Sequence, residues 1–251
     1  PHVVIGCLDP NPKVAGNGVR ILRDAGISVE LAADPTPFQA VNQAFFVNQL
    51  EKRAFISLKW AESADGMMAK RNGSAMGYGP VSITGPAANL YSHHLRAKHH
   101  AIMVGTNTAL IDDPSLTVRH VPGEDPIRII FDRNQRLSGQ AFFSDQVKSI
   151  LLGPKRTDLA NHVHTFEPSG WQDVRLISEE LFAACGISSI LVEGGSHLLQ
   201  QFIDQGVWDR IYRYKSPKSI GEGLSSPQLT QTEPYDSCAI GQDWLFEYRQ
   251  S

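Results

Sequence analysis

A carboxylate and two glycines directly follow an apolar, β-branched run in the second half of the chain. Residues 187–202 read ISSILVEGGSHLLQQF, so Glu193 stands at the carboxyl end of a predicted strand and the glycines open a predicted helix. Glycine lets backbone approach a ligand closely, and the free N–H groups at the start of a helix attract phosphate. The segment therefore indicates an enzyme that binds a phosphorylated ligand or a nucleotide.

A second strand-to-helix junction, residues 101–108, carries Gly-Thr-Asn-Thr after the apolar run AIMV. Open α/β sheets collect ligands at the carboxyl ends of their strands, so two such junctions favour a binding site over ordinary tight turns. The next loop supplies Asp112 and Asp113, which either orient ribose hydroxyls or simply cap and turn the chain. Arg119 then offers a planar fork for a phosphate, the alternative being a solvated loop.

Lys59 is the unusual residue of the apolar segment 55–60. A lysine between apolar neighbours in a strand points either to solvent or into a polar site, because its charge is costly to bury alone. Both orientations stay open from the residues alone.

Four histidines, at positions 93, 94, 99 and 100, invite a metal-binding interpretation that their spacing does not support. Adjacent side chains on a helix diverge by about 100°, and no H-E-x-x-H pattern or nearby thiol accompanies them. We predict solvated residues on a helix face and no metal site.

The bulk composition is that of an ordinary globular protein, since 41% of the 251 residues are hydrophobic and 20% are charged. A net charge of −3 creates no broad field that would attract nucleic acid or an anionic membrane. No apolar run approaches the about 18 residues that a membrane span needs. Three separated cysteines without a C-x-x-C pair argue against a disulfide framework and fit a reducing cytoplasm, where we expect the protein.

Strand and helix signals alternate along most of the chain. Strands are predicted at 3–8, 27–31, 55–60, 101–105, 127–131, 149–152, 187–192, 211–214 and 244–248, and helices at 17–25, 37–49, 86–98, 108–111, 179–185 and 197–205. The alternation indicates an α/β protein with a mainly parallel sheet. A first, small unit covers residues 1–50, and a second unit starts near residue 51.

Several of these segments, in this order, resemble the bifunctional deaminase–reductase family of riboflavin biosynthesis. The matching stretches are 8–16, 58–66, 83–86, 95–97, 101–105, 112–119 and 192–195, which are spread over nearly the whole chain. No single stretch is specific, but the ordered set is.

The resemblance implies a dihydrofolate-reductase-like fold for residues 51–251, a mixed, mainly parallel sheet flanked by helices. Residues 1–50 then resemble the C-terminal remnant of a cytidine-deaminase-like α/β domain, with its zinc motifs upstream of Asp9-Pro10. The full-length parent is expected to be a multifunctional enzyme, both a zinc-dependent deaminase, which is a hydrolase, and an oxidoreductase. Zinc belongs only to the missing deaminase part, so these residues alone are not expected to deaminate.

The resemblance also implies NADPH-dependent reduction of 5-amino-6-(5-phosphoribosylamino)uracil to its ribitylamino product. By position, cofactor contacts fall on Ala61, Thr108, Asp112, Gly195, Ser196, His197, Leu198, Leu199, Gln200 and Gln201. Substrate contacts fall on Arg96, Leu116, Arg119 and Glu193, with the two arginines at the ribose phosphate. The predicted catalytic residues are Glu193, which exchanges a proton with the opening sugar, and Lys59, which polarises the ribose oxygen.

One segment departs from the family pattern. Many relatives carry Ser-x-Trp-Ile-Thr before the helix that starts at Pro86, whereas this chain has PVSIT at 80–84. Pro80 replaces the serine that would touch substrate, and Ser82 replaces the tryptophan that would lie against the cofactor. The backbone of Ser82 is still expected to contact the cofactor. Arg133 stands where relatives often have a small hydroxyl residue, and we hypothesise that it meets the 2′-phosphate of NADPH.

Two other functions stay open at this stage. One is another dihydrofolate-reductase-like enzyme that acts on a related pteridine or pyrimidine, and the other is a catalytically silent NADPH-binding subunit. Related reductases are commonly dimers. We therefore expect a homodimer that binds a small phosphorylated pyrimidine, with neither nucleic acid nor membrane as a partner.

Overall fold

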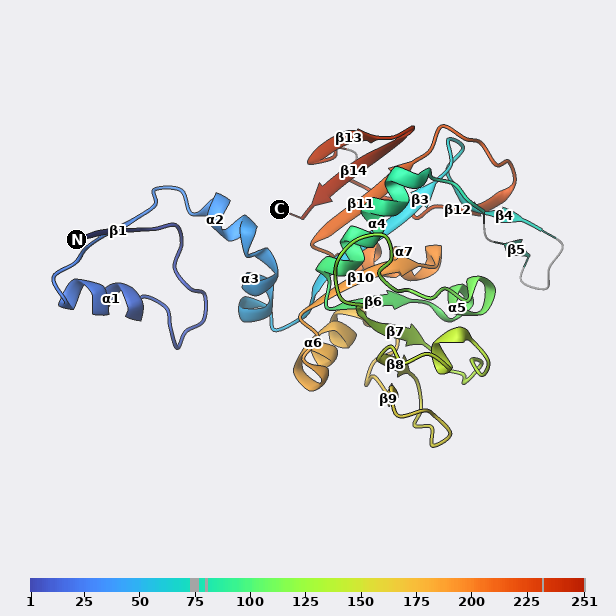
Figure 1. Cartoon of the computed structure of the whole chain (residues 1–251), viewed down its shortest axis with the longest axis horizontal. Helices are drawn as coiled ribbons and strands as arrows, with labels where there is room; N and C mark the ends of the chain where they lie inside the picture. Colours follow the sequence, from blue (N-terminus) through green and yellow to red (C-terminus); the bar gives the residue numbers. More distant parts are fainter. Residues whose placement is uncertain (73–76, 80, 232, 251) are drawn as a thin grey trace. The chain divides into compact units, whose positions relative to one another are not determined.

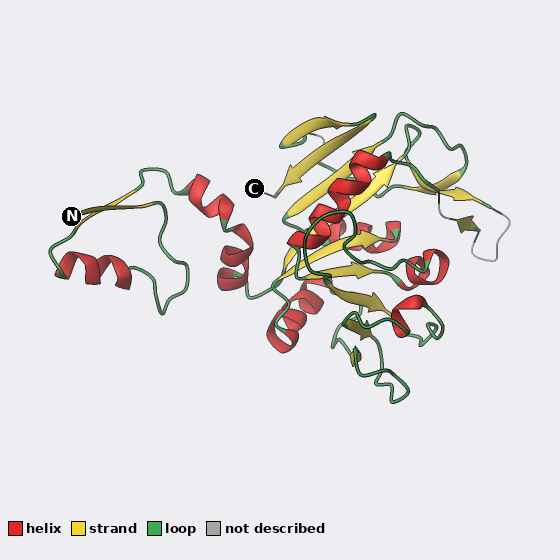
Figure 2. Cartoon of the chain, viewed as in Figure 1, coloured by secondary structure: helices red, strands yellow, loops and turns green. Residues whose placement is uncertain are grey.

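The computed structural model divides the chain into two units. It describes residues 1–72, 77–79, 81–231 and 233–250. One unit comprises Pro1–Phe55 and Glu179–Ser188, and the other comprises Ile56–Ser178 and Ser189–Ser251. Figures 1 and 2 show the helices and strands of each unit along the chain. Every residue predicted for the site belongs to the second unit.

The first unit is built on one parallel pair of short strands. Its elements are β1 (His2–Ile5), α1 (Asn17–Asp24), β2 (Ser28–Leu31), α2 (Thr36–Val41) and α3 (Gln43–Leu50). The single helix predicted over 37–49 is wrong, because Asn42 lies between two helices with φ −111° and ψ 25°. Asparagine favours such breaks, since its side chain competes for nearby backbone groups. The interpretation of this unit as a deaminase remnant stays a prediction.

A nine-stranded sheet organises the second unit, in the order β13-β14-β11-β3-β10-β6-β7-β8-β9. Its strands are β3 (Phe55–Glu62), β6 (Ala101–Val104), β7 (Ile127–Phe131), β8 (Ser149–Leu152), β9 (Val163–Phe166), β10 (Ser189–Gly194), β11 (Arg210–Lys215), β13 (Asp236–Ile240) and β14 (Asp243–Arg249). β11 pairs with β3 in parallel, and the run from β10 to β9 is parallel throughout. β14 pairs antiparallel with β11 on one side and with β13 on the other. The mixed, mainly parallel sheet confirms the predicted fold class.

Helix α4 covers one part of this sheet, and its predicted span of 86–98 is confirmed. Leu95 of α4 packs in one buried cluster with Leu191 of β10, Tyr214 of β11 and Leu245 of β14. The remaining helices of the second unit are α5 (Thr106–Asp112) and α7 (Ser196–Asp204), with a short 3₁₀ turn, η1 (Ala141–Phe143). Helix α6 (Val174–Cys185) belongs partly to each unit. Helix α6 starts five residues before its predicted start at 179.

A second buried cluster fills the space between α5 and the middle of the sheet. Ile102 and Val104 of β6, Ile130 of β7 and Leu151 of β8 pack there with Ala109 of α5. Strands that are apolar along their whole length are expected in parallel sheets whose two faces are both covered. Because β6 and β10 are parallel neighbours, α5 and α7 both start at the same edge of the sheet.

A separate three-stranded antiparallel sheet, in the order β12-β4-β5, lies in the same unit. Its strands are β4 (Met67–Arg71), β5 (Tyr78–Gly79) and β12 (Gly223–Ser225). A Cβ atom at position 223 would collide with the carbonyl oxygen of Ala69, so the close pairing of β12 with β4 requires glycine there. None of these three strands was predicted, and neither were β9 and β13.

Candidate active site

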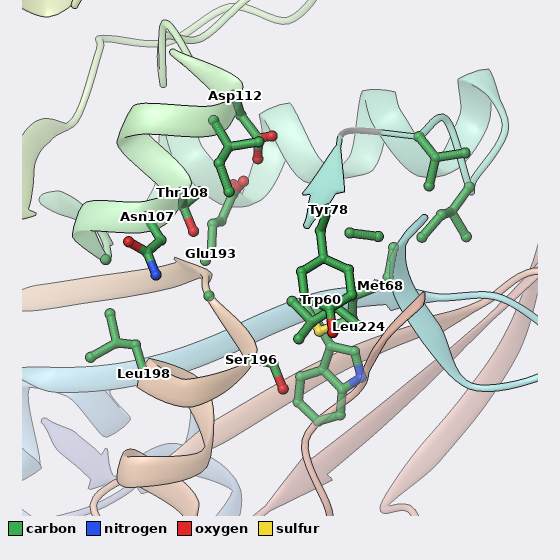
Figure 3. A pocket seen from close by; sticks show the side chains of 18 of the residues that line it. Trp60, Met68, Tyr78, Asn107, Thr108, Asp112, Glu193, Ser196, Leu198 and Leu224 are labelled. Atoms are coloured by element: carbon green, nitrogen blue, oxygen red, sulfur yellow. The ribbon is translucent and has the colours of Figure 1, made fainter. Parts of the chain in front are cut away.

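A cavity of about 1010 Å³ opens where β3, β6 and β10 end. Figure 3 looks into it and shows side chains that come from the main sheet, from α5 and α7, and from the three-stranded sheet. The predicted site residues that line it are Lys59, Ala61, Ser82, Thr108, Asp112, Glu193, Gly195, Ser196, His197, Leu198 and Gln201. Two distant junctions of the sequence therefore meet at one site.

Three charged side chains form a buried cluster at this cavity. The guanidinium of Arg96 donates two hydrogen bonds to Glu193, Nε to Oε1 and Nη2 to Oε2, both at 2.8 Å. The Nζ atom of Lys59 lies 3.9 Å from the same carboxylate and 5.6 Å from the ring centre of Tyr214. The side chains of Lys59, Arg96 and Glu193 are only 16%, 14% and 7% exposed. Lys59 thus points into a polar site and not to solvent.

Burial and charge set the protonation of this cluster. Burial raises the pKa of Glu193, but Lys59 and Arg96 lower it more, and the carboxyl pKa falls to about 2. Burial lowers the pKa of Lys59, with Arg96 acting in the same direction and the Glu193 carboxylate opposing both. Glu193 is therefore a carboxylate at neutral pH, while Lys59 releases its proton more easily than an ordinary lysine.

Stability in acid is expected to depend on Glu193. Because its pKa drops from an ordinary 4.5 to about 2 on folding, the unfolded chain takes up the proton first as the pH falls. The resulting stabilisation is complete above pH 4.5 and is lost towards pH 2, by up to about 3 kcal/mol. Urea unfolding of the parent and of Glu193→Gln from neutral pH to about pH 3 measures it. The variant should lose less stability over that interval, and an equal loss would contradict the assignment.

The two strand-to-helix junctions form a close backbone cradle. In the parallel pairing of β10 with β6, Gly194 stands opposite Val104. A Cβ on Gly194 would lie 2.8 Å from Cγ2 of Thr108, so only glycine fits there without movement of α5. Gly195 has φ +80° and no side-chain cap covers the first N–H groups of α7, whose first turn lines the cavity. Such uncapped N–H groups suit an anionic ligand.

Replacing Gly195 with alanine is expected to destabilise the protein by about 1–3 kcal/mol and to weaken binding at the cradle. The cause is conformational, because its φ of +80° is one that residues with a Cβ rarely adopt. Thermal unfolding and NADPH titration measure the two effects. Gly139→Ala is the matched control, since its φ is not positive and a Cβ there meets no atom within 4 Å. Equal behaviour of the two variants would show that the cradle needs no glycine at 195.

The loop after α5 has an unusual backbone. Asp113, Leu116 and His120 adopt positive φ values of 35°, 54° and 70° without being glycine. Such conformations are uncommon and cluster at functional sites. Leu116 is only 2% exposed, and Arg96 donates from Nη1 to the carbonyl oxygen of Thr117 at 3.1 Å. The loop is therefore tied to the charged cluster, while Leu116, a predicted substrate contact, is part of the core.

Two of the four histidines are not solvated residues, so that prediction is wrong for them. His93 is 1% exposed, and its Nδ1 accepts a hydrogen bond from the backbone N–H of Arg119 at 3.0 Å. The ring of His99 contacts the hydroxyl of Ser57 at 2.8 Å and the carbonyl oxygen of Leu95 at 2.7 Å. Burial lowers the pKa of both histidines. His93 thereby positions the backbone of the loop that carries Arg119.

Several predicted contact residues are not among the described residues that line the cavity. Arg96 faces Glu193, the exposed guanidinium of Arg119 contacts the hydroxyl of Ser115, and Leu199 is fully buried. Gln200 bonds Asp204 and the backbone of Gln228, and the guanidinium of Arg133 lies 5.5 Å from the ring centre of Trp171. Pro80 lies outside the described residues.

Sequence reasoning missed one wall of the cavity. Tyr78, Met68 and Leu224 reach it from the three-stranded sheet, next to Trp60 of β3 (Figure 3). Tyr78 brings an aromatic ring to a site whose expected tryptophan is replaced by Ser82. Asn107 and Arg136 also line the cavity and were not predicted to do so.

No group of three or more His, Cys, Asp or Glu side chains among the described residues is arranged to hold a metal ion. None of the helices in the described ranges combines the length and the apolar character needed to cross a membrane.

Comparison with known proteins gives one consistent result. The family model for the RibD C-terminal domain matches residues 54–246. The riboflavin biosynthesis protein RibD of Aquifex aeolicus is 35% identical over 236 residues, which are 91% of this chain and 64% of that protein. The chain thus spans slightly less than two thirds of that relative.

Solved structures agree with this match. RibD of Acinetobacter baumannii has a TM-score of 0.83 and 29% identity, and the match covers 99% of this chain and 72% of that one. The deaminase/5-amino-6-(5-phosphoribosylamino)uracil reductase of Thermotoga maritima has a TM-score of 0.84 and 29% identity, with 100% and 71% covered. The chain therefore belongs to the RibD C-terminal domain family of riboflavin biosynthesis.

Proposed function

We propose that this chain is the reductase of 5-amino-6-(5-phosphoribosylamino)uracil and uses NADPH. The observation that carries the proposal is the buried cluster of Lys59, Arg96 and Glu193 beside a cradle of two glycine junctions. A charged cluster next to an anion-binding cradle fits a reaction between a nucleotide cofactor and a sugar phosphate. The similar Thermotoga maritima protein is described as a diaminohydroxyphosphoribosylaminopyrimidine deaminase and 5-amino-6-(5-phosphoribosylamino)uracil reductase.

The residues present fit a dinucleotide. Gly195 and Ser196, at the uncapped start of α7, would hold its phosphates, and Thr108 closes the cradle from the opposite junction. The apolar wall of Met68, Tyr78 and neighbouring residues offers a flat surface to a planar ring. NADPH would supply the hydride that reduces C1 of the ribose.

The charged cluster would supply the proton that the ribose ring oxygen gains in this reaction. Reduction at C1 breaks its bond to the ribose ring oxygen, and that oxygen must gain one proton as the sugar opens. Lys59 is the better proton donor of the cluster, because burial lowers its pKa whereas Glu193 stays ionised. Glu193 would instead hold Lys59 and Arg96 in place and offset their charge. The structure thus favours an electrostatic role for Glu193 over the proton exchange expected from the sequence.

Arg119 remains the candidate for the substrate phosphate, since the guanidinium of Arg96 is already bonded to Glu193 and Thr117. Arg119→Ala is expected to raise the KM for the phosphorylated substrate by about 10- to 100-fold, with little change in kcat. Steady-state kinetics with and without the 5′-phosphate measures this. The dephosphorylated substrate should not distinguish parent from variant, and a similar loss with both substrates would contradict a phosphate contact.

The proposed activity is tested by incubating the chain with NADPH and the ribosylaminouracil phosphate and identifying the product by mass spectrometry. A ribitylamino product, two hydrogens heavier than the substrate, supports the proposal. NADPH binding without product would favour a silent subunit, and turnover of a pteridine alone would favour a different reductase. Deamination by the whole protein is a further proposal, and an activity assay of the full-length chain tests it. A homodimeric state is another, and light scattering tests it.

A further inference from the structure

Two arginines stand three residues apart in the turn that follows β7, and both side chains are exposed. Their side chains lie in different surroundings. Arg136 lines the cavity, whereas the guanidinium of Arg133 lies 5.5 Å from the ring centre of Trp171 and is not among the described lining residues. A ligand in the cavity therefore meets Arg136 first.

The backbone that carries Arg136 is held firmly. Asp132 is 1% exposed, and its carboxylate accepts hydrogen bonds from the N–H groups of Arg136 at 2.7 Å and Leu137 at 3.3 Å. Leu137 is fully buried and anchors the end of the turn in the core. Arg156 lies 3.7 Å from the same carboxylate and offsets its charge. The turn is therefore organised before any ligand arrives, which lowers the cost of binding.

The side chain of Arg136 reaches across to α5, where its Nη1 donates to Oδ1 of Asn107 at 3.1 Å. Among the described residues, Asn107 is its side-chain hydrogen-bond partner, so most of the five guanidinium N–H donors are available to a ligand. In Figure 3, Asn107 lies on one side of the cavity, and Tyr78, Met68 and Leu224 lie on the other. A dinucleotide whose planar reacting ring lies on the apolar wall would extend its far end towards Asn107 and Arg136.

We propose that Arg136, oriented by Asn107, binds the 2′-phosphate of the cofactor and makes the site prefer NADPH to NADH. This inference rests on the proposed function, since it assigns one end of the same cavity. A guanidinium matches a phosphate with two parallel N–H donors, and NADH offers no charge at that position. Arg133 is then not the specificity residue, in contrast to the hypothesis drawn from the sequence.

The test compares binding of 2′,5′-ADP and of 5′-AMP, which differ only in the 2′-phosphate, to the parent, Arg136→Ala and Arg133→Ala. Calorimetry should show that Arg136→Ala weakens 2′,5′-ADP by about 10- to 100-fold and leaves 5′-AMP unchanged. Arg133→Ala should match the parent for both ligands. The ratio of kcat/KM for NADPH over NADH should fall by a similar factor in Arg136→Ala alone.

Three results would overturn the inference: a parent that binds 2′,5′-ADP no better than 5′-AMP, loss of the difference in Arg133→Ala, or its retention in Arg136→Ala. The binding measurements with 2′,5′-ADP and 5′-AMP do not depend on the pyrimidine substrate. If Arg136→Ala loses affinity for 2′,5′-ADP but the parent turns over no substrate, the proposed reaction is wrong and the 2′-phosphate site at Arg136 is supported. If the parent turns over the substrate but Arg136→Ala keeps the parent's preference for NADPH over NADH, the proposed reaction is supported and Arg136 does not determine cofactor specificity.

Discussion

Glu193→Gln is expected to lower kcat/KM of the reductase reaction by at least about 100-fold. Glutamine keeps the shape of the side chain but removes the negative charge of the carboxylate, to which Arg96 donates two hydrogen bonds of 2.8 Å. Arg96 and Lys59 would then be two cations in a buried site without a counter-charge, so Lys59 would both move and lose its proton more readily. NADPH-consuming assays at neutral pH measure the loss.

The loss must be separated from unfolding. Removing one partner of a buried ion pair costs about 3–5 kcal/mol, within the about 5–15 kcal/mol that holds a typical domain folded. Thermal unfolding and circular dichroism should therefore still report a folded variant. Glu222→Gln is the matched control, because that carboxylate is 81% exposed and should leave both activity and stability unchanged. Near-parent activity of folded Glu193→Gln would contradict the role of the cluster.

Lys59→Met is expected to lower kcat by about 100-fold or more while NADPH affinity changes little. Methionine fills a similar volume and leaves the two hydrogen bonds between Arg96 and Glu193 in place. In the parent, kcat should fall as the pH rises through the pKa of Lys59, which burial and the nearby Arg96 place below the ordinary 10.5. The variant should lack this alkaline fall, because it has no ammonium to deprotonate.

The pH profile decides between a chemical and a structural role of Lys59. Lys148→Met, a change of an exposed lysine before β8, should keep the parent rate and the parent profile. A slow Lys59→Met enzyme that still shows the full alkaline fall would assign the titration to another group. A large rise in KM with unchanged kcat would make Lys59 a binding residue only.

The strongest elements of this site could be predicted from the sequence because their signals are local. The junction at Glu193–Gly195 combines a β-branched run, a carboxylate and two glycines within a few residues, and the structure places it in the cavity wall. Lys59 stood out because a charge interrupts an apolar strand. Its buried position beside Glu193 depends on the neighbouring strands β3 and β10, which are more than a hundred residues apart in the chain.

The remaining features depend on contacts that leave no local pattern. Strands β4, β5 and β12 have two to five residues and no clear alternation, so the wall with Met68, Tyr78 and Leu224 could not be foreseen. The choice between Arg133 and Arg136 depends on how buried Asp132 folds the turn. The burial of His93 follows from a loop that returns to cover α4, which no sequence period records.

Hydride transfer itself is the most direct test of the proposed reaction. NADPH deuterated at the transferred position is incubated with this chain and the ribosylaminouracil phosphate, and the product is analysed by mass spectrometry and NMR. We predict a ribitylamino product with one deuterium on C1 of the former ribose, formed at a rate that drops sharply in Lys59→Met and Glu193→Gln. Absence of turnover, or a product without deuterium at C1, would contradict it.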